Sequence, residues 1–276
     1  MDSEPLFPPE IEREIFETTA LVHSGTIFAL LRVARRVLIW IEPLLYRVIR
    51  VGHENSSMVR ALVDALASKP PEFVHHAVRH LGLDSIYSPC TASEGRQLLA
   101  LCKGLVNFGS TNGFTDPLLL PLLAEMHVQR LALNLVDLFG ATPIDLAHPL
   151  FRSVTHFDIF GFDGIVEVLP DVPLLPALTH LCVNSHISRQ MLLNVLVDCP
   201  RLRLLLVQWH SQERDSYDLA RAHHEYDARF VIGLYGDYWA EWEAGARGLP
   251  DQWTQGDDFI ARKRNGEIEA TRYWLE

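Results

Sequence analysis

The sequence has little positive charge and no long hydrophobic run. Its 276 residues include 24 lysines and arginines against 35 aspartates and glutamates, a formal net charge of −11 at pH 7. A negative field repels phosphate backbones, so this charge disfavours nucleic-acid binding. The most apolar stretches are short, because Pro121 interrupts residues 118–123 and Asn134 interrupts residues 131–139. We therefore expect neither a nucleic-acid partner nor a segment that crosses a membrane.

Cysteine is scarce as well, and its spacing is not that of a metal site. There is no Cys-x-x-Cys pair, and three cysteines lie in apolar phrases where a thiol packs as a small buried side chain. We expect reduced structural thiols. The acidic start at residues 1–4 lacks the basic head and apolar middle of a secretory signal. These features predict an intracellular protein, located in the cytoplasm, the nucleus or both. The cysteines are Cys90, Cys102, Cys182 and Cys199.

The motifs of common active sites are also missing. The sequence contains no Gly-x-Ser-x-Gly elbow, no dinucleotide-binding glycine pattern and no phosphate-binding loop. His76 and His80 have the spacing of helical metal ligands, yet His80 falls in an expected strand. Residues 223–225, which read His-His-Glu, lack a second histidine at the required spacing. We predict no metal, no cofactor and no catalytic residues.

Two short phrases bracket a compact N-terminal segment. Residues 7–11 read FPPEI and residues 43–47 read PLLYR. Paired prolines suit a helix start, and the apolar residues that follow recur with helical spacing. Further apolar groups occupy residues 27–33 and 37–41. The pattern predicts three short helices with a shared core or a partner.

These phrases resemble the F-box over about residues 4–49, and residues 30–36, LLRVARR, look especially like large fungal F-box-like families. The resemblance implies docking on the Skp-type adaptor of a cullin-RING ubiquitin ligase. Many F-boxes have a tryptophan where this chain has Val37, and the nearest one is displaced to Trp40. A degenerate module that only covers the N-terminal end of a scaffold therefore remains an alternative. The expected adaptor-binding residues are Phe7, Pro8, Ile11, Ile15, Leu30, Val33, Leu44 and Leu45.

The middle of the chain repeats a loose Leu-x-x-Leu-x-Leu phrase, whose alternating end suits a strand with one buried side. The phrases start 23 to 27 residues apart, inside the roughly 20–29-residue window of leucine-rich repeats. Helices are expected between them, as at residues 96–101, 118–126 and 187–197. The asparagine typical of such repeats is missing, so an ordinary layered α/β domain is the alternative. The six phrases begin at Val78, Leu105, Val128, Val154, Leu178 and Leu202.

A polar ladder is expected on the inner, concave face of the strands. Third-position residues are mostly polar, and fifth-position residues are mostly small, which leaves room for contact with a ligand. An ordinary solvated strand face is the alternative. A cavity that closes around these histidines beside an acidic group would instead favour a small-molecule enzyme. The predicted substrate-binding residues are His80, Asn107, Arg130, His156, Asp158 and His180.

The last part of the chain is polar at first and then rich in aromatic residues. A strand at 229–234 and helices at 238–246 and 257–264 are expected to cap the open end of the repeats. An aromatic binding patch is the alternative. The predicted fold is α/β, with an F-box-like three-helix module at 4–49, a curved leucine-rich-repeat-like array at 50–210 and an aromatic α+β cap at 211–276. The predicted function is non-catalytic substrate reception for an SCF-type ligase.

Overall fold

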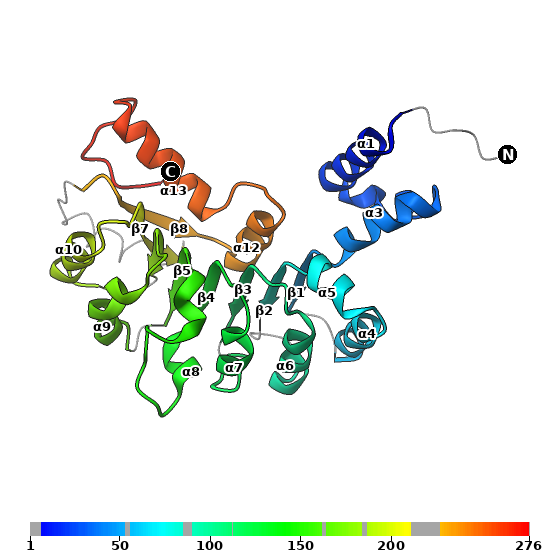
Figure 1. Cartoon of the computed structure of the whole chain (residues 1–276). Coiled ribbons are helices and arrows are strands. Elements are labelled where there is room, and N and C mark those ends of the chain that lie inside the picture. The colour runs from blue at the N-terminus through cyan, green and yellow to red at the C-terminus, as the bar shows by residue number, and fades with distance from the viewer. Residues whose placement is uncertain are drawn as a thin grey trace.

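The computed structural model describes residues 7–52, 56–84, 90–111, 113–161, 164–183, 187–210 and 227–275. They form an α/β fold built on one eight-stranded sheet (Figure 1), in which every strand is parallel to its neighbours and the strands follow chain order. The strands are β1 (Val48–Val51), β2 (His80–Leu83), β3 (Asn107–Ser110), β4 (Arg130–Asn134), β5 (His156–Phe160), β6 (His180–Val183), β7 (Leu204–His210) and β8 (Phe230–Tyr235).

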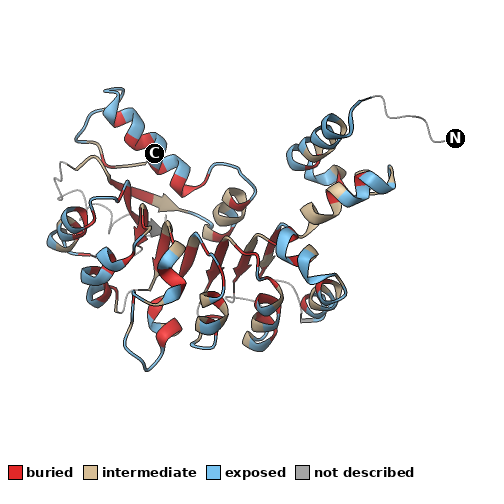
Figure 2. Ribbon diagram, viewed as in Figure 1, coloured by how far each residue is buried: buried red, intermediate tan, exposed pale blue. Residues whose placement is uncertain are grey.

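Helices on one face of the sheet connect successive strands, because parallel strands need crossover connections (Figure 1). The strands are largely buried, and these helices turn exposed faces outward (Figure 2). The predicted alternation of strand and helix is confirmed. The helices are α4 (Ser56–Ala67), α5 (Pro71–Ala77), α6 (Ala92–Leu101), α7 (Leu119–Ala124), α8 (Leu135–Phe139), η2 (Pro149–Ser153), α9 (Ile165–Val168), η3 (Leu169–Leu174) and α10 (Arg189–Asp198).

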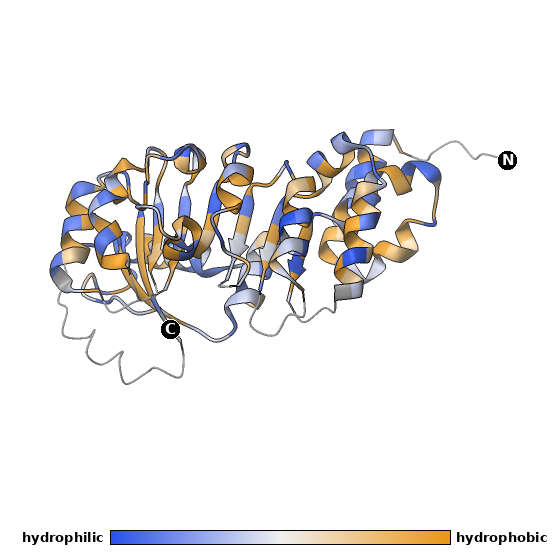
Figure 3. Ribbon diagram, turned by 90° about the horizontal axis from the view of Figure 1, so that it is seen from below, coloured by the Kyte–Doolittle hydropathy of each residue, from blue (hydrophilic) through white to orange (hydrophobic). Residues whose placement is uncertain are grey.

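The main core lies between the sheet and these helices. The fourth residue of each repeated phrase is almost fully buried, and strand register places all six in one row. Figure 3 shows hydrophobic and hydrophilic residues interspersed along the strands and helices. All six phrases therefore form the strands that their alternation predicts. The row consists of Leu81, Phe108, Leu131, Phe157, Leu181 and Leu205.

Strand β1 was missing from the predicted set, although it follows the same pattern. Tyr46, Ile49 and Val51 occupy the opening, fourth and sixth positions of the phrase, since Ile49 pairs with Leu81 and Val51 pairs with Leu83. An aromatic residue replaces the opening aliphatic side chain, and it also belongs to the PLLYR phrase. The sheet therefore begins before the predicted boundary at residue 50.

The N-terminal residues form a separate small helical packing unit. It contains α1 (Pro9–Val22), η1 (Ser24–Thr26), α2 (Ile27–Leu30) and α3 (Arg35–Leu45). The three α-helices confirm the prediction of three short helices. Pro8 precedes α1 at the N-cap, where its missing N–H costs nothing. Glu12 and Arg36 join α1 to α3 through two hydrogen bonds of 2.7 Å. This unit lies beyond the β1 end of the sheet (Figure 1), and its core contains Ala20, Ile27, Val37 and Ile41.

The C-terminal residues contain α12 (Tyr238–Ala246) and α13 (Gln252–Arg264), which lie on the opposite face of the sheet from α4–α10 (Figure 1). The expectation that this segment only caps the open end is wrong. After α13 the chain does return to the edge: the Ile232 N–H donates to the Tyr273 carbonyl at 2.7 Å, and the Leu275 N–H donates to the Ile232 carbonyl at 2.9 Å. Both helices, however, lie across the sheet surface that carries the predicted ladder.

Several predicted bounds shift by local capping. Helix α13 begins at Gln252 rather than 257, because the Asp251 side chain accepts from the Thr254 N–H in a capping box. The strand expected at 229–234 is β8, and the expected helix at 238–246 is α12. The predicted polar stretch at 211–226, with His223, His224 and Glu225, lies outside the described residues.

All four cysteines are buried. Among the described helices, none is both long and apolar enough to span a membrane.

Candidate functional site

The polar ladder predicted from the repeats forms one continuous row across five neighbouring strands. Strand register pairs His80 with Asn107, Asn107 with Arg130, Arg130 with His156, and His156 with His180. The predicted alignment of these positions is therefore confirmed. Asp158 lies two residues beyond His156, so it belongs to the same face in the next row. The row and Asp158 together are called the polar ladder below.

Helix α12 covers the part of this face that belongs to β2 and β3. A Cβ atom on Gly82 would lie 2.9 Å from the ring of Trp239 and 3.1 Å from that of Trp242. A Cβ atom on Gly109 would lie 3.1 Å from Trp239. The two indole rings therefore rest directly on the backbone of these strands. The small fifth-position residues do leave room, but the chain's own tryptophans fill it, so the prediction that this room is open for a ligand is wrong.

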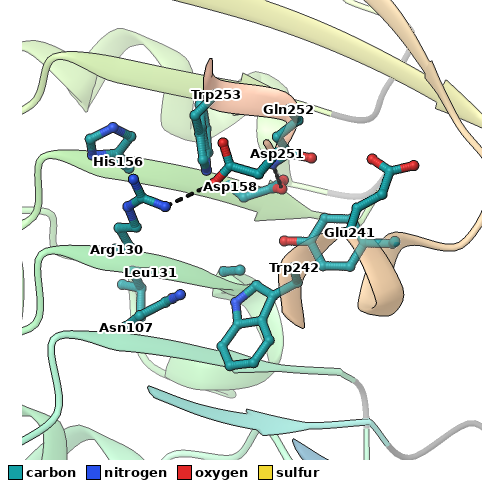
Figure 4. Close-up of a pocket in the computed structure, with 12 residues that line it drawn as sticks. Asn107, Arg130, Leu131, His156, Asp158, Glu241, Trp242, Asp251, Gln252 and Trp253 are labelled. Carbon is teal, nitrogen blue, oxygen red and sulfur yellow. Dashed lines mark hydrogen bonds and ion pairs between the residues drawn. The ribbon is translucent and has the colours of Figure 1, made fainter. Parts of the chain in front are cut away.

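The first half of α13 supplies polar partners to the rest of the ladder (Figure 4). Arg130 Nη1 donates to Asp251 Oδ2 at 2.9 Å, and Gln252 Nε2 donates to Asp158 Oδ2 at 3.0 Å. His180 Nε2 lies 3.2 Å from both carboxylate oxygens of a third helix residue, Asp257. Asp158 and His180 are buried beneath these partners, and Asn107 on β3 is buried as well. The ladder is an internal interface and not the open concave surface that we expected.

Two histidines of the ladder are stacked, and burial favours the neutral form of both rings. The rings of His156 and His180 are 4.1 Å apart and nearly parallel, with an interplanar angle of 4°. Trp253 meets both at an edge, with centroids 5.3 and 6.0 Å away. Burial, followed by the charges of His180 and Arg130, lowers the pKa of His156 to about 3. Burial also lowers the pKa of His180, although Asp257 opposes it. Both rings therefore act as packing groups at neutral pH.

Asp158 is a buried carboxyl group in contact with several polar side chains. Burial raises its pKa to about 6, while hydrogen bonds from Gln252, Tyr238 and Cys182 oppose the rise. Burial and the nearby Asp158 raise the pKa values of Tyr238 and Cys182 in turn. The cavity beside these groups measures only about 20 Å³, enough for roughly one water molecule. This arrangement holds α12 and α13 on the sheet and gives a small-molecule substrate no space.

The residues that cover the ladder were not among the predicted site residues. They are aromatic and polar residues of the C-terminal segment, which were assigned to a cap. One local signal was available, since Asp251 and Thr254 have the spacing of a capping box. Among the described residues, no cluster of three or more histidine, cysteine or acidic side chains could hold a metal ion. The covering residues are Trp239, Trp242, Asp251, Gln252, Trp253 and Asp257.

A second candidate surface lies on the N-terminal helices. Phe7, Ile11 and Ile15 leave 48%, 45% and 46% of their surfaces exposed, and Val33 leaves 58% exposed. Pro8 is exposed too. Leu30, Leu44 and Leu45 are instead partly buried against the core of the helical unit. The predicted adaptor-binding set therefore divides into two groups. Phe7 and Pro8 before α1, Ile11 and Ile15 on α1, and Val33 before α3 are exposed, whereas the three leucines hold the helices together.

Comparison with known proteins adds no family to this geometry. No protein-family model matches the chain, and no curated protein matches it.

Proposed function

We propose that this chain is a non-catalytic substrate receptor of an SCF-type cullin-RING ubiquitin ligase. In this proposal the N-terminal helices are an F-box-like module that docks on the Skp-type adaptor. The parallel sheet with its outer helices is a degenerate leucine-rich-repeat-like array, to which the C-terminal segment adds an inner layer. The array would hold a protein substrate, so that binding raises the local concentration of its lysines near the ubiquitin-carrying partner.

The observation that carries the proposal is the exposed apolar surface of the helical unit. The unit has its own core, yet it leaves Phe7, Ile11, Ile15 and Val33 substantially exposed. Isolated apolar residues on a surface need no explanation, but Ile11 and Ile15 lie four residues apart on one face of α1, which favours an interaction site. The resemblance of the FPPEI phrase to the F-box opening supports the adaptor as the partner. Phe7, Pro8 and Ile11 belong to both the phrase and the surface.

Val37, which differs from the usual tryptophan, is compatible with this proposal. Its side chain is fully buried in the core of the unit, together with Ile41 and Ala20. A valine there changes internal packing and removes no exposed contact. The alternative is a scaffold whose helical unit has lost adaptor binding. Leu30, Leu44 and Leu45 favour that alternative, because packing already uses much of their surface.

Co-purification of the full chain with a fungal Skp-type adaptor tests the proposal. We expect the parent chain to retain the adaptor and Ile11→Asp to lose it, since a carboxylate on the exposed face would be buried at the interface. Val197→Asp is the matched control, because Val197 is an exposed valine on α10 at 75% exposure. Circular dichroism and thermal unfolding should be unchanged in both variants. Failure of the parent chain to retain the adaptor would favour the scaffold, and retention by both the parent and Ile11→Asp would show that the exposed face of α1 is not the docking surface.

A further inference from the structure

A cavity of about 810 Å³ lies where the N-terminal helices meet the sheet. Its floor is the beginning of β1 to β4, and its walls are α1, α2 and the residues that end α12. The apolar part of its lining comes from α1, α2, the end of α3, β1, the residue before β3 and the segment that ends and follows α12. The volume falls within the roughly 300–1,000 Å³ range of ligand-binding pockets, which favour junctions between structural units. The main apolar lining residues are Leu21, Ile27, Leu44, Val48, Val106 and Leu249.

The charged part of the lining is entirely basic. Arg47, Arg130 and Arg247 line the cavity, and none of its lining residues is acidic, although the chain carries an excess of acidic residues. Arg130 and Arg247 are paired with carboxylates outside the lining, namely Asp251 and Glu243. Arg47 is exposed and forms no salt bridge within the described part of the chain. One guanidinium group is therefore available for an incoming anion.

His80, in the floor of the cavity, has one ring nitrogen without a hydrogen-bond partner among the described residues. This nitrogen, Nδ1, is buried. Burial, then the charges of Arg47 and Arg130, lowers the pKa of this ring to about 4, so it is neutral at pH 7. A neutral imidazole can donate one hydrogen bond, and a buried donor without a partner is unfavourable. A carboxylate held at Arg47 would therefore lie beside a neutral ring whose Nδ1 atom solvent does not reach.

Two side-chain amides complete the lining. Asn107 on β3 and Gln129 before β4 both line the cavity beside Arg130. An amide side chain both donates and accepts hydrogen bonds, as pairing with a peptide group requires. The lining therefore combines an apolar wall, amides suited to a peptide bond, and a cation beside an unpartnered imidazole. A simple alkyl acid would use only the wall and the cation.

We propose that this cavity binds the C-terminal end of a partner polypeptide, with an apolar last residue against the wall and its α-carboxylate at Arg47. Capture of a terminal carboxylate is a known mode of peptide recognition. The binding does not require the adaptor. If the receptor function proposed above holds, this cavity is where the substrate binds, and His80, Asn107 and Arg130 are the ladder residues that border it.

The test measures binding of the full chain to fluorescein-labelled peptides by fluorescence anisotropy. The probe is a pool of eight-residue peptides whose last four positions are apolar, prepared once with a free carboxylate and once with a carboxamide. We expect the acid pool to bind and the amide pool to bind at least about tenfold more weakly, because a charged acceptor is replaced by a neutral one. Decanoate at the same concentration should displace the acid pool poorly.

Variants locate the binding site without disturbing the core. Arg47→Met should weaken acid-pool binding at least about tenfold, whereas Arg152→Met, on the exposed surface of η2, should not. Leu249→Asp places a negative charge in the cavity wall at an exposed position and should also weaken peptide binding. Leu249→Asn has a side chain of the same shape as that variant without the charge, so it should retain most of the binding. Equal binding of both pools, no binding at about 1 mM, or unchanged binding by Arg47→Met would overturn the proposal. Adaptor retention measured in parallel keeps the two proposals separate.

Discussion

Arg130 on β4 and Asp251 before α13 are joined by a 2.9 Å hydrogen bond between residues separated by 121 positions in the chain. The Asp251 carboxylate has a second role, because its other oxygen accepts from the Thr254 N–H at 2.9 Å and caps the helix. One side chain thus starts α13 and fixes it to the sheet. This pairing explains why the polar ladder, regular as it is in sequence, is covered in the folded protein.

Asp251→Ala should destabilise the protein more than loss of a helix cap alone. A cap contributes about 1 kcal/mol, and removal of the carboxylate also leaves Arg130 without its partner in a partly buried site. We expect a total loss of roughly 2–3 kcal/mol in the free energy of unfolding, measured by urea denaturation. Asp237→Ala is the control, because Asp237 caps α12 through the Ala240 N–H in an exposed position. Equal losses in the two variants would show that the contact with β4 contributes nothing.

Gly82→Ala should disturb the packing of α12 on the sheet. The added methyl group would lie 2.9 Å from Trp239, closer than carbon atoms can pack, so the indole or the helix has to move. Overpacking of this kind costs about 1–3 kcal/mol. Urea denaturation and the emission maximum of tryptophan fluorescence measure the two effects. Gly25→Ala, where a Cβ atom meets nothing within 4 Å, should change neither. A stability of Gly82→Ala equal to that of the parent would contradict the placement of α12.

The stacked histidines should make the protein less stable in mild acid. The folded pKa of His156, about 3, lies below its ordinary value of 6.5, so the unfolded chain binds the proton first as pH falls. Stability therefore decreases as pH falls from about 6.5 toward about 3, by up to about 1.4 kcal/mol per pH unit for one proton. His156→Gln should show a shallower decline between pH 6 and pH 4 in urea denaturation. Parallel curves for parent and variant would refute a buried neutral histidine.

Asp158 should produce the opposite pH dependence. Its folded pKa, about 6, lies above its ordinary value of 3.8, so stability is lost as pH rises through this interval and the carboxyl group ionises in a buried site. Asp158→Asn cannot ionise and can still accept from Gln252. Relative to the parent, this variant should gain stability between pH 4 and pH 7, by at most about 3 kcal/mol. The quantity to measure is the unfolding free energy of Asp158→Asn minus that of the parent, at each pH. If this difference stays constant from pH 4 to pH 7, Asp158 is not a buried carboxyl group that ionises in this range.

Val37 and Val33 should differ sharply in their contribution to stability. Val37 is fully buried in the helical unit, whereas Val33 is mostly exposed. Val37→Ala leaves a cavity and should cost roughly 1–3 kcal/mol, and Val33→Ala should stay within about 0.5 kcal/mol of the parent. Thermal and urea unfolding followed by circular dichroism would measure both. A silent Val37→Ala would remove the argument that this position serves internal packing.

The periodic parts of the fold could be read from the sequence because their determinants are local or repeat with a constant spacing. Alternation in each phrase sets which side of a strand is buried, and the repeat spacing aligns Leu81 with Phe108 and His80 with Asn107. The prolines at the start of α1 and the spacing of apolar residues after them define the first helix in the same way. The aromatic opening of β1 departs from the pattern, and that strand was missed.

Contacts that do not recur from repeat to repeat and that join residues far apart in the chain could be seen only in the tertiary structure. Polar side chains such as His156 and Arg130 have the same periodicity whether they face water or a covering helix, so the repeat alone does not distinguish an open surface from an interface. The small residues Gly82 and Gly109 indicate space but not its occupant. The sequence by itself determined seven of the eight strands, the spacing of the repeats and the three N-terminal helices. The folded chain decided that α12 and α13 cover the ladder, because that outcome depends on whether Trp239, Asp251 and Trp253 find matching partners on the sheet.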